Sequence, residues 1–237
     1  MGNILSANHI KAIRALSAKK YRDETGLFVV EGEKMVSEAL ESDFQVVEVW
    51  RRDEIGYDAM ARISQLSSPS PVLAVVKAKP LDDAPECGGL CLALDGVRDP
   101  GNFGTIIRLA DWFGADIIYA SRDSVELYNP KTVQATMGAI FRKKVVYCDI
   151  PRLCRRFKEA GLPVYGTFLD GQDIYGQALS KEGLVIMGNE SAGISQEVAE
   201  EVDRRLLIPS FSNGPTAESL NVAVATAITL SEFRRRL

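Results

Sequence analysis

Short apolar runs alternate regularly with helix-like segments from residue 90 to the end of the chain. Strands that alternate with helices predict a mostly parallel sheet with helices on both faces, because each helix returns the chain to the starting edge of the sheet. The expected strands are Leu90–Leu94, Asp116–Ala120, Lys144–Cys148, Pro163–Thr167, Leu184–Met187 and Arg205–Ile208. The expected helices are Asn102–Phe113, Pro130–Phe141, Ile150–Ala160, Gln196–Val202 and Ser219–Arg236.

The first 76 residues have weaker but similar signals, which predict a small α/β domain of mixed strand order. Ile10, Ile13 and Leu16 recur at helical spacing. The further expected elements are strands at Leu27–Val30, Val46–Trp50 and Val72–Val76, and helices at Lys34–Leu40 and Met60–Leu66. Residues 77–89, KAKPLDDAPECGG, are rich in proline, glycine and charge, as is typical of a linker. The predicted domains are therefore 1–76 and 90–237, joined by the linker 77–89.

Composition excludes several classes of protein. The chain is 46% hydrophobic and 25% charged, and no apolar run approaches the roughly 20 residues that span a membrane. Its four cysteines, Cys87, Cys91, Cys148 and Cys154, do not form a dense disulfide framework, so we expect a reduced, cytoplasmic setting. The only histidine is His9, which argues against a catalytic triad and against a metal site.

Three polar, glycine-containing loops follow apolar strands in the second domain. They are DGVRDPGNFGTIIR (95–108), LVIMGNESAGIS (184–195) and LLIPSFSNGPTAESLNV (206–222). Ligands of parallel α/β sheets bind beyond the carboxyl ends of the strands, so these loops predict one composite site. The phosphate-binding patterns of kinases, NTPases and simple dinucleotide enzymes are absent from the sequence.

Basic residues gather at the amino terminus although the formal net charge of the chain is −4. The first 22 residues contain no acidic residue. Such a cluster either binds an RNA phosphate backbone or is a solvated helix face, and the sequence favours neither. The candidate RNA-binding residues are Lys11, Arg14, Lys19, Lys20 and Arg22.

The three loops, taken in order, resemble the three motifs of the SpoU/TrmH branch of the SPOUT RNA methyltransferases. The resemblance rests on LDGVRDPGNFGTIIRLADWFGAD, LVIMGNESAGIS and LLIPSFSNGPTAESLNVAVATAITLSEF and covers residues 90–237. The run KAIRALSAKKYRDETGLFVVEGEKMVSEAL also resembles the small substrate-binding domain of members that act on ribosomal RNA.

This resemblance implies a fold, a reaction and a set of site residues. It implies an α/β domain with a carboxy-terminal trefoil knot, a homodimer, and transfer of a methyl group from S-adenosylmethionine to a ribose 2′-hydroxyl of RNA without a metal. The resemblance of the amino-terminal domain favours ribosomal RNA as the substrate. Residues matching the catalytic positions are Asn102, Arg108, Glu190, Ser219 and Asn221. Residues matching the cofactor-binding positions are Thr167, Gly188, Gly193, Ile208 and Leu220.

Each candidate side chain also has a purely structural explanation. Asn102 and Ser219 are suitable helix caps, Asn221 then lies in a first turn, Glu190 is suited to cap a helix near Ser195, and Arg108 has the spacing for an ion pair with Asp111. The ordered recurrence of three motifs favours function over these explanations taken together. Two other functions remain open: a ribose methyltransferase acting on transfer RNA, and an RNA- or ribosome-binding factor without catalysis.

Arg108 is expected to position substrate and not to act as a base. A guanidinium group stays protonated in ordinary protein surroundings, so it is a poor proton acceptor. It is well suited to holding the phosphate next to the target ribose through paired hydrogen bonds. The sequence therefore predicts that Arg108 orients the RNA and that the base is supplied largely by the substrate.

Overall fold

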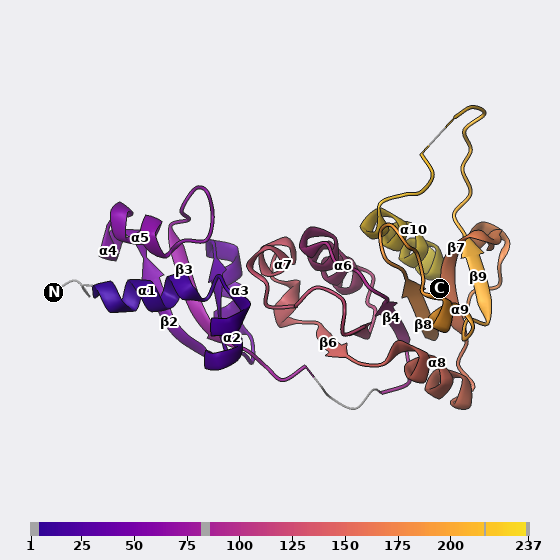
Figure 1. Cartoon of the computed structure of the whole chain (residues 1–237), viewed down its shortest axis with the longest axis horizontal. Helices are drawn as coiled ribbons and strands as arrows, with labels where there is room; N and C mark the ends of the chain where they lie inside the picture. Colours follow the sequence, from indigo (N-terminus) through magenta and orange to yellow (C-terminus); the bar gives the residue numbers. More distant parts are fainter. Residues whose placement is uncertain (1–4, 82–85, 216, 236–237) are drawn as a thin grey trace. The chain divides into compact units, whose positions relative to one another are not determined.

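Residue contacts divide the chain into two compact units (Figure 1). The computed structural model describes residues 5–81, 86–215 and 217–235. The first unit contains Met1–Pro80 together with Glu126–Arg142, and the second contains Leu81–Val125 and Lys143–Leu237. The segment Glu126–Arg142 thus packs with the amino-terminal unit although the strands around it belong to the second. The boundaries drawn from sequence, at residues 76 and 90, stay a prediction, and part of the linker lies outside the described residues.

The second unit is built on a six-stranded sheet with the order β6-β5-β4-β8-β7-β9. All its neighbouring strands pair in parallel, which confirms the predicted sheet. The strands are β4 (Leu90–Leu94), β5 (Ile117–Ala120), β6 (Lys144–Tyr147), β7 (Val164–Asp173), β8 (Gly183–Met187) and β9 (Arg204–Leu207). Because β4 and β8 are central neighbours, the loops that leave their carboxyl ends lie beside each other.

The helices of this unit begin at well-formed amino-terminal caps. Asp99 caps α6 (Pro100–Trp112) and Asp149 caps α8 (Ile150–Glu159), each with a proline in the first turn, where its missing N–H costs nothing. The remaining helices are α9 (Gln196–Ala199), α10 (Val222–Arg235) and the short 3₁₀ helix η2 (Ile174–Gly176). Helix α10 packs against α6, and Arg234 near its end donates to the carbonyl oxygen of Phe113 at 2.7 Å.

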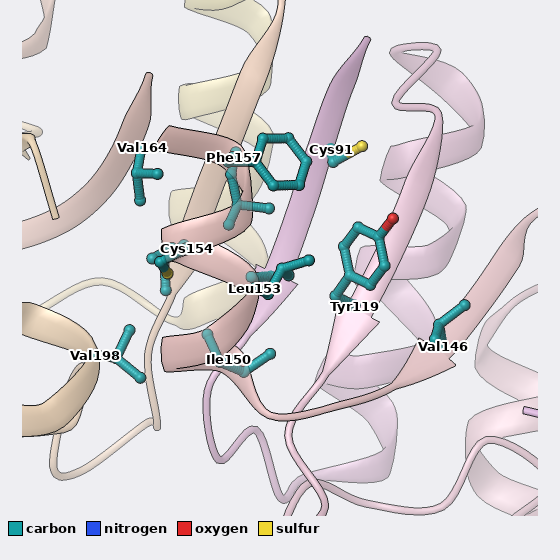
Figure 2. Close-up of a cluster of buried hydrophobic side chains, with 12 residues drawn as sticks. Cys91, Tyr119, Val146, Ile150, Leu153, Cys154, Phe157, Val164 and Val198 are labelled. Carbon is teal, nitrogen blue, oxygen red and sulfur yellow. The ribbon is translucent and has the colours of Figure 1, made fainter. Parts of the chain in front are cut away.

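One buried cluster fixes α8 against a face of this sheet (Figure 2). Leu153, Cys154 and Phe157 of α8 pack with Tyr119 of β5, and the rings of Tyr119 and Phe157 meet edge to face at 6.4 Å. The hydroxyl of Tyr119 donates to the carbonyl oxygen of Glu86 at 2.5 Å and accepts from its N–H at 3.1 Å. Apolar burial therefore anchors the strands whose ends carry the polar loops.

The first unit has a three-stranded antiparallel sheet with the order β1-β3-β2. Its strands are β1 (Leu27–Glu31), β2 (Val46–Arg51) and β3 (Val72–Lys77). Its helices are α1 (Ala7–Ala15), α2 (Lys19–Thr25), α3 (Glu33–Glu41), α4 (Arg52–Ile55), α5 (Tyr57–Ile63), α7 (Pro130–Ala135) and η1 (Ala139–Phe141). Helices α2 and α4 were not predicted, because they are short and strongly charged and lack a clear apolar period.

Two of the predicted helices differ from the observed ones. The expected helix over Pro130–Phe141 divides into α7 and η1, because Met137 and Gly138 have φ angles of +49° and +98°, which no α-helix accommodates. The expected helix from Ser219 begins instead at Val222. Its predicted end at Arg236 lies outside the described residues.

Within the described residues, every helix is too short or too polar to cross a membrane. The trefoil knot implied by the resemblance stays a prediction.

Candidate active site

A chain of three side chains joins the loops that the sequence singled out. The Nδ2 group of Asn102 donates to Oε1 of Glu190 at 3.1 Å. The Nδ2 group of Asn221 donates to Oδ1 of Asn102 at 2.9 Å. One residue comes from each of the three loops, so the structure brings them into one composite site.

Backbone groups hold Asn102 and Glu190 in place. The carboxylate of Asp99 accepts from the N–H of Asn102 at 2.8 Å, so Asp99 is the cap of α6 and Asn102 lies in its first turn. Glu190 accepts from the N–H groups of Asp99 at 3.2 Å and Arg98 at 3.4 Å. The alternative roles of Asn102 as a cap and of Glu190 as a cap near Ser195 are therefore wrong.

Asn221, not Ser219, caps α10. Its Oδ1 accepts from the N–H groups of Ala223 at 2.9 Å and Val224 at 3.3 Å, which leaves its Nδ2 free to donate to Asn102. This pattern fixes which end of each amide is the donor. Asn221 therefore couples the start of α10 to the first turn of α6, while Ser219 lies in an exposed stretch before the helix.

Arg108 is exposed on α6. No hydrogen bond or ion pair joins it to another residue within the described parts of the chain, so the alternative pairing with Asp111 is not formed. An unpaired guanidinium on the helix that carries Asn102 is available to an incoming anionic group.

A cavity of about 300 Å³ opens next to this chain of side chains. It is lined by Glu190 and Ser219 among the predicted catalytic residues. It also brings together all five predicted cofactor-binding residues, Thr167, Gly188, Gly193, Ile208 and Leu220. Asn102, Arg108 and Asn221 do not line it, so the predicted catalytic residues divide between the cavity and its neighbourhood.

The loop after β8 approaches itself so closely that one position requires glycine. Asn189 and Gly193 exchange backbone hydrogen bonds of 2.9 and 3.0 Å. A Cβ atom on Gly188 would lie 2.3 Å from the carbonyl carbon of Gly193 and 2.3 Å from the nitrogen of Ile194. This wall of the cavity is therefore bare backbone, which is suited to hydrogen bonding a nucleoside through N–H and C=O groups.

Two polar residues of the site were missed from the sequence. Asn189 accepts from the N–H groups of Ser191 and Ala192 at 3.0 and 2.9 Å and donates to the carbonyl oxygen of Gly96 at 2.6 Å. Asp95 accepts from the N–H of Ser195 at 2.7 Å. The sequence feature that could have identified them is an acidic or amide residue at the start of a glycine-containing loop. Such side chains commonly form hydrogen bonds with neighbouring backbone groups.

The amino-terminal basic cluster separates into different roles. Arg22 is only 5% exposed, its guanidinium binds both oxygens of Glu126 at 3.0 and 2.7 Å, and it also donates to the carbonyls of Leu16 and Ser17. Its assignment to RNA binding is therefore wrong, because burial and pairing occupy its donors. Lys19 and Lys20 form exposed pairs within α2, while Lys11 and Arg14 are exposed without a partner in the described ranges. RNA binding by these four stays a prediction.

His9 and the cysteines have structural surroundings. The Nε2 atom of His9 lies 2.8 Å from Glu48, and its ring meets the edge of Trp50 at 5.5 Å. All four cysteines are unpaired. Within the described ranges, no three histidine, cysteine, aspartate or glutamate residues are grouped as a metal site would need.

In this parallel α/β unit, hydrogen bonds join the polar loops, and a backbone-lined cavity lies at the strand ends. Such an arrangement is typical of enzymes that bind a nucleoside cofactor. The chain belongs to the SpoU rRNA methylase family, whose model matches residues 89–231, and residues 7–75 match the MRM3-like substrate-binding domain. The family match makes it a methyltransferase that uses S-adenosylmethionine.

Proteins that are similar along nearly the whole chain are also rRNA methyltransferases. The 23S rRNA (guanosine(2553)-2'-O)-methyltransferase RlmP of Bacillus subtilis is 32% identical over 241 residues, 95% of each chain. The 23S rRNA (uridine(2479)-2'-O)-methyltransferase of Streptomyces viridochromogenes is 27% identical over 94% of this chain and 88% of its own. The AdoMet-bound rRNA methyltransferase of Sinorhizobium meliloti is 32% identical with a TM-score of 0.87, covering 99% of this chain and 97% of its own.

Proposed function

We propose that the protein transfers a methyl group from S-adenosylmethionine to a ribose 2′-hydroxyl of ribosomal RNA. The observation that carries the proposal is the bonded chain Glu190–Asn102–Asn221 beside a cavity walled by backbone. The relatives named above, which act on ribosomal RNA, support the substrate. A ribosomal RNA substrate supports a cytoplasmic site of action.

The residues present fit the cofactor. Gly188, Ile208 and Leu220 offer backbone groups for an adenosine, and Gly188 admits no Cβ atom. S-adenosylmethionine supplies an electrophilic methyl group when bound. Glu190 and Asn221 hold the amide of Asn102 from both sides, so this amide is rigid and is positioned by three loops at once. Rigid positioning suits an in-line transfer, in which small misplacements cost much of the rate.

Arg108 binds the phosphate next to the target ribose and leaves proton acceptance to the substrate. Its exposure and lack of a partner among the described residues support this role, since its donors are available for paired hydrogen bonds. Arg108→Lys keeps the charge but loses the planar fork. We expect single-turnover methylation to fall roughly 10- to 100-fold, the equivalent of one lost hydrogen bond to a charged group. Near-normal turnover with unchanged RNA affinity would contradict the positioning role.

The substrate is tested by mapping 2′-O-methyl groups. Purified protein and S-adenosylmethionine are incubated with unmodified ribosomal RNA, transfer RNA and DNA of matched sequence, and methyl incorporation is measured. We expect incorporation at one site in ribosomal RNA and none in DNA, which lacks the 2′-hydroxyl. Incorporation only into transfer RNA would select the alternative substrate. Failure to bind S-adenosylmethionine in calorimetry would select the non-catalytic RNA-binding factor.

We also propose that the enzyme is a homodimer that associates through α6 and α10. These helices pack together, and each leaves an apolar side chain in solvent: Trp112 is 84% exposed and Val224 is 48% exposed. Large exposed aromatic residues are enriched at interfaces. Light scattering after size exclusion is expected to give twice the 25.9 kDa chain mass for the native protein and for Tyr57→Lys, and the single mass for Trp112→Lys. A monomeric native protein would overturn the proposal.

A further inference from the structure

The first unit contains a second cavity, of about 320 Å³, that the methyltransferase reaction does not use. It is lined by residues of β1, of the segment after α5, and of α7. Its volume is at the lower end of the range of small-ligand sites, which suits a single nucleotide. Its lining combines apolar residues with polar ones, as is typical of small-ligand sites.

The acidic residue of the lining is Glu31, which is only 3% exposed. One carboxylate oxygen accepts from the hydroxyl of Ser64 at 2.6 Å and the other accepts from the N–H of Gln65 at 2.6 Å. Burial raises the pKa of this carboxyl, and the two hydrogen bonds oppose that effect. A carboxylate has about four acceptor positions, so two remain for donors that enter the cavity.

Gln65 contributes a donor that lacks an acceptor. Its Nε2 group is buried and has no hydrogen-bond partner among the described residues, although the residue lines the cavity. An unsatisfied buried donor costs about 1–3 kcal/mol, so buried donors are normally paired in the working state of a protein. Because this atom is closed to solvent, an acceptor in the cavity reaches it only after the Gln65 side chain rotates toward the cavity.

The remaining walls suit a base with its phosphate. Leu66, Pro130 and Ala135 give apolar surface for the faces of a ring. Lys131, also part of the lining, is exposed and makes no side-chain hydrogen bond or ion pair within the described part of the chain. Its ammonium group can therefore contact a phosphate while the ring lies inside.

We propose that this cavity holds a guanine base of the RNA substrate by its Watson–Crick edge. Guanine presents two neighbouring donors, N1–H and the N2 amino group, for the free positions of Glu31. Its O6 accepts from Nε2 of Gln65 once that side chain has rotated toward the cavity. Adenine presents an acceptor where guanine has N1–H, and uracil and cytosine lack two adjacent donors beside an acceptor. A site built for such hydrogen bonds rejects analogues that leave its polar groups unpaired. The inference rests on the proposed function only in taking the ligand from RNA, and this guanine need not be the methylated nucleotide.

The test uses the full-length protein with guanosine and adenosine monophosphates as probes. Affinity is measured by saturation-transfer NMR for the native chain, Glu31→Gln, Ala135→Leu and the matched control Glu33→Gln, an exposed acid two residues further along the chain. We expect at least tenfold tighter binding of the guanosine nucleotide to the native protein and to the control. Glu31→Gln should lose this preference, because an amide offers one acceptor in place of two. Ala135→Leu should weaken binding of both nucleotides by filling the cavity.

Calorimetry with S-adenosylmethionine on the same variants separates this site from the methyltransferase site. Unchanged cofactor affinity together with lost guanosine preference supports the proposal, even if ribosomal RNA proves not to be the substrate. Equal binding of the two nucleotides by the native protein overturns it, as does a Glu31→Gln variant that behaves like Glu33→Gln. Should Glu31→Gln fail to fold, undiminished guanosine binding by Ala135→Leu overturns it alone.

Discussion

Asn102 shows how one residue acquires its role from its neighbours. In the sequence it is an amide near the start of a helix, and caps of that kind are common. In the structure Asp99 takes the capping role, and Asn102 is left to bond Glu190 and Asn221. Its side-chain amide therefore forms both hydrogen bonds only when the three loops are correctly assembled.

Asn102→Ala should remove the hydrogen bonds that link Glu190 and Asn221, without removing a residue that lines the cavity. We expect the rate of methyl transfer to fall about 10²-fold, the effect of a small misplacement of reacting groups. Affinity for S-adenosylmethionine should stay the same, because Asn102 does not line the cavity. Single-turnover methylation and calorimetry measure the two quantities. Thr105→Ala, an exposed position on the same helix, serves as the control, and an equal rate loss there would argue against a specific role for Asn102.

The short helix α2 of the first unit gains tertiary support from the side chain of Arg22. Helix α2 has seven residues and no side-chain cap, and isolated helices of that length are unstable. Arg22 ties it to Glu126, a residue far along the chain but in the same unit. The contact gives α2 a tertiary support that its own sequence does not provide.

Arg22→Ala is expected to destabilise this unit strongly. The change leaves the carboxylate of Glu126 and the carbonyls of Leu16 and Ser17 without their donor. Breaking one side of a buried ion pair costs about 3–5 kcal/mol of unfolding free energy. Urea denaturation followed by circular dichroism measures it. The control Lys20→Ala removes an exposed ion pair and should change the unfolding free energy by less than about 1 kcal/mol. Similar losses in the two variants would show that the buried ion pair stabilises the unit no more than an exposed one.

Apolar packing holds the second unit together, and its four cysteines report the integrity of that packing. Burial raises the pKa of Cys91 and of Cys154 to about 12 and that of Cys148 to about 11. Burial also raises the pKa of Cys87. Because the thiolate is the reactive form, all four thiols should react slowly while the second unit is folded.

Thiol labelling against pH tests this arrangement. With an aromatic disulfide reagent, the native rate should still be rising between pH 9 and about 10.5, where an ordinary thiol with a pKa near 8.5 has levelled off. In denaturant all four thiols should react at once. Rapid reaction of two or more thiols in the native protein at neutral pH would contradict the predicted burial.

The sequence predicted the parallel sheet and the site-bearing loops because local information carries them. Apolar runs such as Leu90–Leu94 and Leu184–Met187 are readable as strands, and the polar residues that follow them must lie at the carboxyl edge. The limits of helices were less certain, as Met137 and Gly138 show, because a break needs only two left-handed residues.

Residue order by itself thus determined the α/β architecture, the family and the three loops that meet at the site. Only the tertiary structure decided which partner each polar group has. It made Arg22 a buried support and not an RNA contact, and it placed Gln65 beside Glu31 at a second cavity. Among the residues that the structure describes, it left Arg108 unpaired. The physical reason is that strand and helix signals are local in the chain, whereas hydrogen-bond partners and burial depend on segments that meet only after folding.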